Sequence, residues 1–325
     1  MPEGRSHFPL SQYRRVIISG GTGFIGRHLT QALVGQGLEV VVLTRQKDSH
    51  DRLAGVQYET FDFADREQCL CLRDSFVGCD LFFHLAAEVV WKTEFSQEGL
   101  ISFRTHVSNP ITLIGILEPW LRKAVLGSSI MVYPLVSDHD LVEGHDEAPP
   151  NFYGTHKLVL EKSVEVWARA EKKSFSVMRI AQAYGPGMRA NRFLLGTIDA
   201  ALAGQPIELF GDGSPRVDWI YIADVVDGLI QAAAYNGSDV FNIASGHAPT
   251  NREVAETIVR VTGSSSKISN AKDKPAADRR QVISIRKANE LLGYQPQFDL
   301  EAGIRHMLET SLRASAGHVQ QGRAR

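Results

Sequence analysis

The sequence of 325 residues has few cysteines, no long apolar run and no excess of either charge. No stretch approaches the run of about 18 apolar residues that a membrane-spanning helix needs, and residues 1–15 lack the apolar core of a signal peptide. Its three cysteines, Cys69, Cys71 and Cys79, show no metal-ligand spacing, and their odd number is typical of a reducing compartment. The net charge of −2 comes from scattered residues, which disfavours nucleic acid and anionic membranes as partners. We therefore expect a cytoplasmic protein, without a metal, whose ligand is a small molecule.

A glycine-rich turn between an apolar segment and an amphipathic helix is the motif around which the sequence is organised. Residues 16–18 are of strand type, and the helix after the turn places Ile25, Leu29 and Leu33 on one face. Glycine permits positive φ and a close approach of pyrophosphate, while a helix N-terminus offers unpaired N–H groups. We therefore predict a dinucleotide site here, the alternative being a turn that serves folding alone. Its residues are Gly20, Gly23, Phe24, Ile25 and Gly26.

The end of the second predicted strand bears on the choice of cofactor. Residues 38–43 form this strand, and Thr44 and Arg45 follow it. An acid at this place holds the ribose hydroxyl of NAD, whereas an arginine accommodates the 2′-phosphate of NADP. Because the acid is absent and Arg45 is present, the sequence favours NADP over NAD. A solvated surface charge is the alternative role of Arg45.

Two further strand ends are expected to contact the cofactor. Asp62 and Phe63 follow the strand at 56–61, where Asp62 accepts from the adenine amine or else caps a helix. The strand that begins at Cys79 contains His84, which we interpret as a hydrogen-bonded core histidine. Small residues after it let the cofactor lie against the backbone. They are Leu85, Ala86 and Ala87.

Strand-type and helical segments alternate along most of the chain. A helical segment at 97–122, interrupted near Pro110, precedes a fifth strand that reaches Tyr133. Further segments follow with the same alternation. This pattern predicts an α/β fold with a doubly wound parallel sheet of the Rossmann type, covered by helices on both faces.

Three polar residues form the candidate catalytic group. Ser129 lies near the end of the fifth strand, and Tyr153 and Lys157 are one turn apart on a helix predicted to run to about residue 170. A tyrosine with its usual pKa near 10 is a poor base, but a neighbouring ammonium and a nicotinamide cation favour phenolate. We predict that Tyr153 exchanges a proton with a substrate oxygen that Ser129 also contacts. A chance Tyr-x-x-x-Lys spacing is the alternative.

Together these motifs resemble the extended short-chain dehydrogenase/reductases, in particular the nucleotide-sugar epimerase and dehydratase branch, over roughly residues 14–309. The resemblance rests on the glycine turn at 20–26, the Asp-Phe pair, the segments at 84–87 and 128–133, and Tyr153-Gly154-Thr155-His156-Lys157. It implies a nicotinamide cofactor, Tyr153 as acid/base, Lys157 on the cofactor ribose and Ser129 as the polarising hydroxyl. It also implies a homodimer in which helices near 97–122 and 153–170 pair across a two-fold axis.

The later segments resemble the same branch and imply a discontinuous second lobe. We expect a dinucleotide-binding domain at 13–184 plus 217–247 and a smaller α/β substrate lobe at 185–216 plus 248–314. Residues 1–12 and 315–325 read as loose termini.

Departures from the family pattern narrow the reaction. Ile130 and Met131 stand where dehydratases of the branch carry an Asp-Glu pair and decarboxylases usually a Glu, so 4,6-dehydration is disfavoured and decarboxylation weakened. His106 stands where an Asn often kinks the long helix. The remaining departures concern substrate contacts. Gln182 replaces a frequent Asn, Arg216 is shifted one place from a diphosphate-binding Arg, and Arg279 falls near a phosphate-binding Arg or is a solvated loop charge.

These features favour an NAD(P)-dependent oxidoreductase that acts on a carbonyl or hydroxyl carbon of a nucleotide sugar. It is either an epimerase that returns the hydride to the same substrate or a one-way ketoreductase. The alternative is an NADPH-dependent reductase or dehydrogenase of a non-nucleotide carbonyl compound. A non-catalytic protein that senses the cofactor is disfavoured, because Ser129, Tyr153 and Lys157 are all present.

Overall fold

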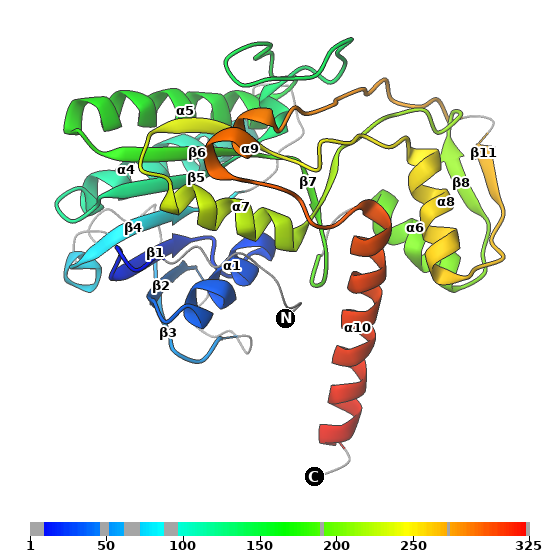
Figure 1. The fold of residues 1–325 in the computed structure, drawn as a ribbon, viewed down its shortest axis with the longest axis horizontal. Coiled ribbons are helices and arrows are strands. Elements are labelled where there is room, and N and C mark those ends of the chain that lie inside the picture. The colour runs from blue at the N-terminus through cyan, green and yellow to red at the C-terminus, as the bar shows by residue number, and fades with distance from the viewer. Residues whose placement is uncertain are drawn as a thin grey trace.

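The computed structural model describes residues 10–45, 52–61, 72–87, 97–188, 192–271 and 274–322. Its central element is a parallel sheet of seven strands in the order β10-β6-β5-β4-β1-β2-β3 (Figure 1). These strands are β1 (Arg15–Ser19), β2 (Glu39–Thr44), β3 (Val56–Thr60), β4 (Cys79–His84), β5 (Lys123–Ser129), β6 (Ser174–Ile180) and β10 (Asp239–Ile243). The doubly wound α/β fold expected from the alternating segments is confirmed.

Helices cover both faces of this sheet, because its central strands are apolar on both sides. Val16 and Ile18 of β1 pack on one face, whereas Ile17 between them packs on the other. The first face is covered by α1 (Phe24–Gly35) and α7 (Ile222–Ala234), and the second by α4 (Asn109–Leu117) and α5 (Phe152–Glu171) (Figure 1). Both layers of helix are therefore needed to bury the sheet.

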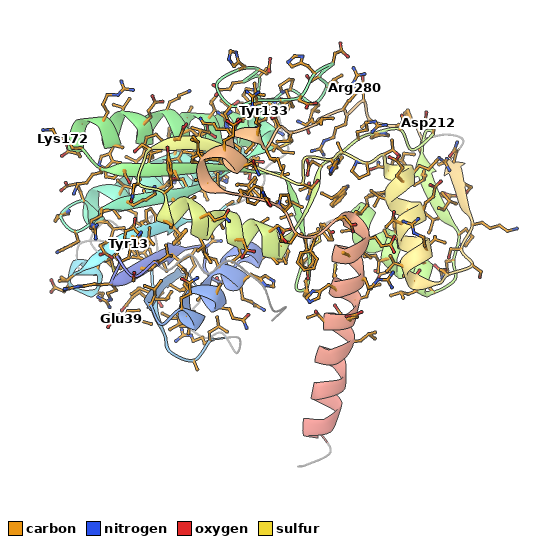
Figure 2. All side chains as sticks on the ribbon, viewed as in Figure 1. Tyr13, Glu39, Tyr133, Lys172, Asp212 and Arg280 are labelled. Carbon is orange, nitrogen blue, oxygen red and sulfur yellow. The ribbon has the colours of Figure 1, made fainter. Side chains whose placement is uncertain are left out.

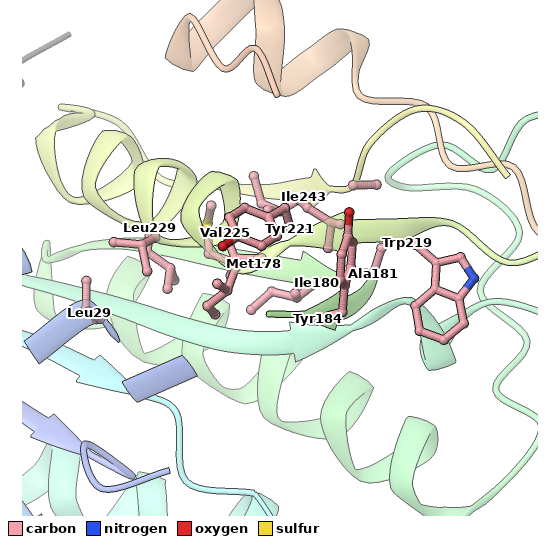
Figure 3. Close-up of a cluster of buried hydrophobic side chains, with 14 of the residues drawn as sticks. Leu29, Met178, Ile180, Ala181, Tyr184, Trp219, Tyr221, Val225, Leu229 and Ile243 are labelled. Atoms are coloured by element: carbon pink, nitrogen blue, oxygen red, sulfur yellow. The ribbon is translucent and has the colours of Figure 1, made fainter. Parts of the chain in front are cut away.

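A smaller group of elements lies to one side of the sheet (Figure 1). It consists of α6 (Arg192–Leu202), α8 (Asn251–Thr262) and a two-stranded sheet of β8 (Ile207–Phe210) and β11 (Ile268–Ala271). A second small sheet, β7 (Gln182–Tyr184) with β9 (Trp219–Tyr221), stands where the chain crosses between the two groups. The core is continuous across this crossing, from Leu29 and Met178 to Tyr184 and Trp219 (Figure 3). Both segments of the expected substrate lobe contribute to the smaller group, whose independence as a domain stays a prediction.

The remaining elements are short, apart from the last helix. They are η1 (Leu72–Phe76), α3 (Gln97–Phe103), η2 (Arg104–Ser108), η3 (Ile130–Val132), α9 (Arg286–Leu292) and α10 (Leu300–Gly322). The interruption expected near Pro110 is a π-helical turn at η2, and Pro110 itself lies at the start of α4. Within the described residues, no helix combines the length and apolar character that crossing a membrane requires.

One sequence expectation about a segment end was wrong. The fifth strand does not reach Tyr133, because the Ser129 Oγ accepts from the Met131 N–H at 3.2 Å and caps the 3₁₀ turn η3. At the C-terminus, α10 continues to Gly322 and extends away from the body (Figure 1), and the loose terminus from residue 315 stays a prediction. Near the other terminus, Leu10 is buried in the main core.

Candidate active site

A cavity of about 640 Å³ opens at the carboxyl ends of β4, β5 and β6, beside the N-terminus of α1. This is the edge at which open α/β sheets bind ligands. Many of the residues singled out in the sequence line it together. They are Gly23, Phe24, Ile25, Leu85, Ala87, Ser129, Tyr153, Lys157, Gln182 and Arg279.

The glycine turn brings three backbone segments into contact. Gly20 has φ of 77°, and a Cβ on it would lie 2.4 Å from the Ala86 N. A Cβ on Gly26 would lie 2.1 Å from the Gly20 O. The Gly23 N–H donates to the same Gly20 carbonyl at 2.9 Å and leads into α1, whose first turn carries no acid. The cavity therefore meets an uncapped helix N-terminus suited to an anionic group.

Gly20, Gly26 and Ala86 support the cavity through their backbones and do not line it. Thr44 is buried at the end of β2, and Arg45 after it is exposed. Neither lines the cavity. The predicted adenine contacts, Asp62 and Phe63, lie outside the described residues.

The N-terminus of α5 packs closely on the turn that follows β5. The Asn151 side chain caps α5 by accepting from the Gly154 N–H at 3.0 Å. A Cβ on Gly154 would lie 2.0 Å from the Met131 O, so only glycine allows this approach. It brings Tyr153 within hydrogen-bond reach of the Ser129 side chain.

Lys157 lies one turn farther along α5. Its Nζ donates to the Gly127 O at 2.7 Å and lies 5.8 Å from the centre of the Tyr153 ring. Ser129, Tyr153 and Lys157 are all buried, so the predicted catalytic group converges at the floor of the cavity.

Burial sets the protonation of this group. It raises the pKa of Tyr153 to about 12, an effect that the hydrogen bond with Ser129 opposes. It lowers the pKa of Lys157 to about 8, against the attraction of Glu161. Loss of water therefore outweighs the Ser129 hydrogen bond, and the lowering of the Tyr153 pKa by Lys157 together with a nicotinamide cation stays a prediction. Tyr153 is a neutral phenol at neutral pH.

A buried ion pair behind the cavity was missed from the sequence. Arg179 on β6 and Glu161 on α5 pair at 2.7 Å, with 1% and 3% of their side chains exposed. The Ser128 hydroxyl donates to Glu161, and Arg179 also donates to the Tyr133 hydroxyl at 2.9 Å (Tyr133 is labelled in Figure 2). The sequence did contain a sign that Glu161 lies near the site, because Glu161 follows Lys157 by four residues and so shares its helical face.

Of the three predicted substrate residues, two line the cavity and one does not. Gln182 and Arg279 line the cavity, and the Arg279 Nε donates to the Gln281 Oε1 at 2.9 Å. Burial lowers the pKa of Arg279. Arg216 is not among the lining residues: it is exposed, and its Nη1 donates to the Ala248 O at 3.1 Å. Its backbone N–H donates to the Arg279 O at 2.8 Å, and of the two side chains only that of Arg279 lines the cavity, so a substrate contact of Arg216 stays a prediction.

Other lining residues had no motif to reveal them. Apolar side chains form much of the wall, and His28 on α1 donates from Nε2 to the Pro186 O at 2.9 Å, joining the two sides. None of the described lining residues is an Asp or Glu, whereas Arg27, Lys157 and Arg279 are cationic. The remaining lining residues are Thr22, Gly127, Ser128, Ile130, Met131, Ile180, Ala181, Ala183, Pro186, Gly187 and Met188.

His84 is a buried core histidine, as interpreted from the sequence. Its Nδ1 lies 2.7 Å from the Ser19 Oγ, and within the described residues its Nε2 has no hydrogen-bond partner. Burial, with smaller effects from Lys157 and His106, lowers its pKa well below the usual value. Across the described ranges, no group of three His, Cys, Asp or Glu side chains is placed to hold a metal ion.

Comparisons with known proteins agree on one family. The family model described as "NAD dependent epimerase/dehydratase family" matches residues 16–244. UDP-glucuronic acid decarboxylase 1 of Xenopus tropicalis is 26% identical over 302 residues, which cover 90% of this chain and 70% of that protein. The UDP-glucose 4-epimerase of Thermotoga maritima has a similar fold, with a TM-score of 0.81 at 23% identity over 92% of this chain and 99% of that one. MoeE5, solved in complex with UDP-glucuronic acid and NAD, has a TM-score of 0.79 at 27% identity, with coverage of 92% and 99%.

Proposed function

The chain belongs to the NAD dependent epimerase/dehydratase family, and from this premise we propose that it transfers a hydride at a carbonyl or hydroxyl carbon of a nucleotide sugar. The observation that carries the proposal is the meeting of Ser129, Tyr153 and Lys157 in the cavity that also holds the N-terminus of α1. A bound nicotinamide dinucleotide would supply the hydride acceptor or donor there. The protein supplies the binding surface and the proton.

The residues present fit such a cofactor. The turn at Gly20–Gly26 leaves no room for a Cβ at either end, so backbone N–H groups can approach a pyrophosphate directly. Lys157 is positioned by the Gly127 carbonyl at the floor of the same cavity, and we propose that it holds the nicotinamide ribose. Leu85 and Ala87 leave the end of β4 open on this side.

The protonation of the site fits a proton donor. Because Tyr153 is a neutral phenol, it can give its proton to the oxygen of a carbonyl as the hydride arrives at carbon. The Ser129 hydroxyl, already within hydrogen-bond reach of Tyr153, would hold that oxygen in place. In the opposite direction the same atoms take a proton from a substrate hydroxyl.

The walls of the cavity favour simple hydride transfer over elimination. Ile130 and Met131 line the cavity where an acid would be needed to remove water, and the described lining contains no carboxyl group. We therefore propose an epimerase or ketoreductase and disfavour 4,6-dehydration, although the family includes dehydratases. The cationic side chains Arg27 and Arg279 support a ligand with phosphate groups. The alternative remains reduction of a non-nucleotide carbonyl compound.

The proposal is tested first by mass spectrometry of the ligands that co-purify with the protein. A retained cofactor favours the epimerase, and an empty protein favours the reductase with exchangeable cofactor. A co-purifying nucleotide sugar would support the substrate class. A non-nucleotide carbonyl compound that co-purifies with the protein would instead favour the alternative, a reductase of such compounds.

The second test is Tyr153→Phe, assayed with UDP-glucose and UDP-glucuronic acid in the presence of NAD or NADP. We expect turnover to fall by about 10²–10⁴-fold, because the phenol proton is lost, while cofactor affinity measured by titration stays nearly unchanged. Normal turnover in the variant would remove Tyr153 from its role. No turnover by the wild type with either sugar would count against these substrates.

A further inference from the structure

A hydrogen bond joins two walls of the cavity that are far apart in the sequence. His28, in the second turn of α1, donates from Nε2 to the Pro186 O at 2.9 Å, although the two residues are 158 positions apart. Both line the cavity. The wall that contains His28 begins at the glycine turn and includes Phe24 and Ile25, whereas Pro186 follows β7, where the chain crosses to the smaller group of elements. The bond therefore ties the proposed cofactor-binding helix to the start of the proposed substrate lobe.

The direction of this bond is fixed by its acceptor. A carbonyl oxygen can only accept, so the hydrogen belongs to His28 Nε2. Burial lowers the pKa of His28, an effect that the bond to Pro186 opposes and the charge of Arg27 increases, so the imidazole is neutral at neutral pH. The ring also meets the Phe24 ring edge to face, with their centres 5.7 Å apart. His28 is thus a neutral donor held against the first turn of α1.

The turn that supplies the accepting carbonyl is packed tightly on its far side. A Cβ on Gly185 would lie 2.4 Å from the Ile222 Cγ2, at the start of α7, so only glycine allows this approach. Tyr184, the residue before it, packs on α10, where a Cβ on Gly303 would lie 2.0 Å from the Tyr184 hydroxyl oxygen. The bond therefore joins α1 to a turn that cannot shift without disturbing α7 or α10.

A dinucleotide bound as proposed would lie between these two walls. The cavity reaches from the start of α1 to Tyr153, and the proposed cofactor spans it from pyrophosphate to nicotinamide. Because His28 and Pro186 line that same cavity, the bond between them sets the separation of its walls. A ligand held between the walls leaves when they separate, and the bond opposes that separation.

We propose that the hydrogen bond between His28 and Pro186 is a latch that retains the dinucleotide cofactor. His28 is a positioning residue here, since it acts through the Pro186 carbonyl and not on the reacting atoms. The latch rests on the proposed function, because it requires a cofactor in this cavity. Slow exchange of the cofactor suits an enzyme whose hydride returns to the same substrate, so the latch favours the epimerase over the ketoreductase.

The latch is tested by the rate at which a reduced cofactor leaves the protein. The protein is loaded with NADH or NADPH, and release is followed by stopped-flow fluorescence after mixing with an excess of the oxidised form. We expect His28→Phe, which keeps an aromatic ring but has no donor, to release the cofactor about 2–10-fold faster, as the loss of one neutral hydrogen bond predicts. His28→Gln should release it at nearly the wild-type rate, because its amide nitrogen is a donor as many bonds from the backbone as Nε2.

A matched control separates the latch from the general effect of replacing a histidine. His139→Phe removes an exposed histidine whose Nε2 lies 3.0 Å from the Asp146 Oδ2, and His139 is not among the described residues that line the cavity. Its release rate should equal that of the wild type. A merely structural role of His28 would lower thermal stability or the fraction of protein that binds cofactor, and His28→Gln would not recover the release rate.

The wild-type protein offers a second measurement if His28→Phe does not fold. ¹⁵N-histidine NMR should show the Nε2–H tautomer for His28, and exchange of this proton with water should slow when NADH or NADPH binds. The opposite tautomer, unchanged exchange, or equal release rates for wild type and folded His28→Phe would overturn the latch and leave the proposed function intact. If neither cofactor binds the wild type, the proposed function fails and the latch fails with it.

Discussion

At the scale of single residues, the site depends on side chains whose properties burial has changed. Burial raises the pKa of Tyr153 and lowers the pKa of Lys157 relative to water, since only 9% and 2% of these residues are exposed. Arg45, by contrast, is exposed immediately after β2, where a ligand can reach its side chain. The predicted preference for NADP therefore depends on one exposed cation, whereas the proposed chemistry depends on buried groups.

Arg45→Ala tests that cofactor preference. If Arg45 accepts the 2′-phosphate of NADP, loss of a charge-assisted hydrogen bond should weaken NADP binding by about 10–100-fold and leave NAD binding nearly unchanged. Titration of cofactor fluorescence or calorimetry measures both constants. The control is Arg52→Ala, which removes another arginine, one that lies over the Tyr58 ring at 5.0 Å. Equal loss for NAD and NADP would contradict the preference, which the solved NAD complex of MoeE5 does not support.

At the residue level, the structure brings the predicted residues together where the pattern that predicts them is local in sequence. The glycine turn and the Tyr153–Lys157 spacing each specify their own geometry, because a turn or one helical repeat fixes it. The position of Arg216 could not be predicted, because it lies in an irregular segment whose backbone pairing with Arg279 depends on the folded lobe. The hydrogen bonds that join Ser102 to His106 and His156 could not be predicted either, because they depend on a π turn and on packing between α3 and α5.

At the scale of elements, α5 connects the catalytic group to the sheet. One face of this helix carries Tyr153, Lys157 and Glu161, each one turn after the last. Glu161 bonds Ser128 at the end of β5 and Arg179 on β6, so it joins the helix to two neighbouring strands. The position of Ser129, the next residue along, therefore depends on the same contact.

Glu161→Ala is expected to destabilise the protein strongly. Removing Glu161 leaves the buried Arg179 charge with Glu147, at 2.5 Å, as its remaining carboxylate partner, so the cost should be at most the roughly 3–5 kcal/mol of a fully broken buried pair. Urea unfolding followed by circular dichroism measures the change. The control is Glu165→Ala on the same helix, which breaks an exposed pair with Arg169 at 2.9 Å and should change stability by about 0–1 kcal/mol. Similar losses for the two variants would show that the buried pair has no special role.

The elements themselves were largely predictable. Apolar runs of β type and amphipathic helices predicted a doubly wound parallel sheet, because its central strands are buried on both faces and its helices on one. The end of β5 was mispredicted, since residues 128–133 are uniformly apolar apart from the serines and only the Ser129 cap stops the strand. Side-chain caps compete with strand propensity in a way that composition does not reveal.

At the scale of the whole molecule, one helical face is rich in exposed apolar side chains. It lies on α3, α4 and α5, the segments expected to pair in a homodimer. Several of its members are 38–66% exposed, and they are Leu100, Ile101, Phe103, Ile111, Val159 and Val166. Such a concentration is typical of a protein interface.

We predict that the protein is a homodimer through this face. Light scattering should give twice the mass of one chain, and Val166→Asp should shift the protein toward the monomer, because a charge would be buried in the interface. The control is Leu312→Asp on α10, where an equally exposed apolar residue, 70% exposed against 65% for Val166, lies outside the face. A wild-type monomer would contradict the prediction.

The order of strands in the sheet also determines when the protein can fold during synthesis. β6 ends at Ile180, but its edge partner β10 begins only at Asp239, about 60 residues later. A ribosome that adds about 5–20 residues per second takes roughly 3–12 s to make that stretch. Throughout this interval β6 has an unpaired edge and an apolar surface containing Val177 and Met178. The nascent chain thus passes through a window of seconds in which the open edge of β6 can pair with another chain before its own last strand is made.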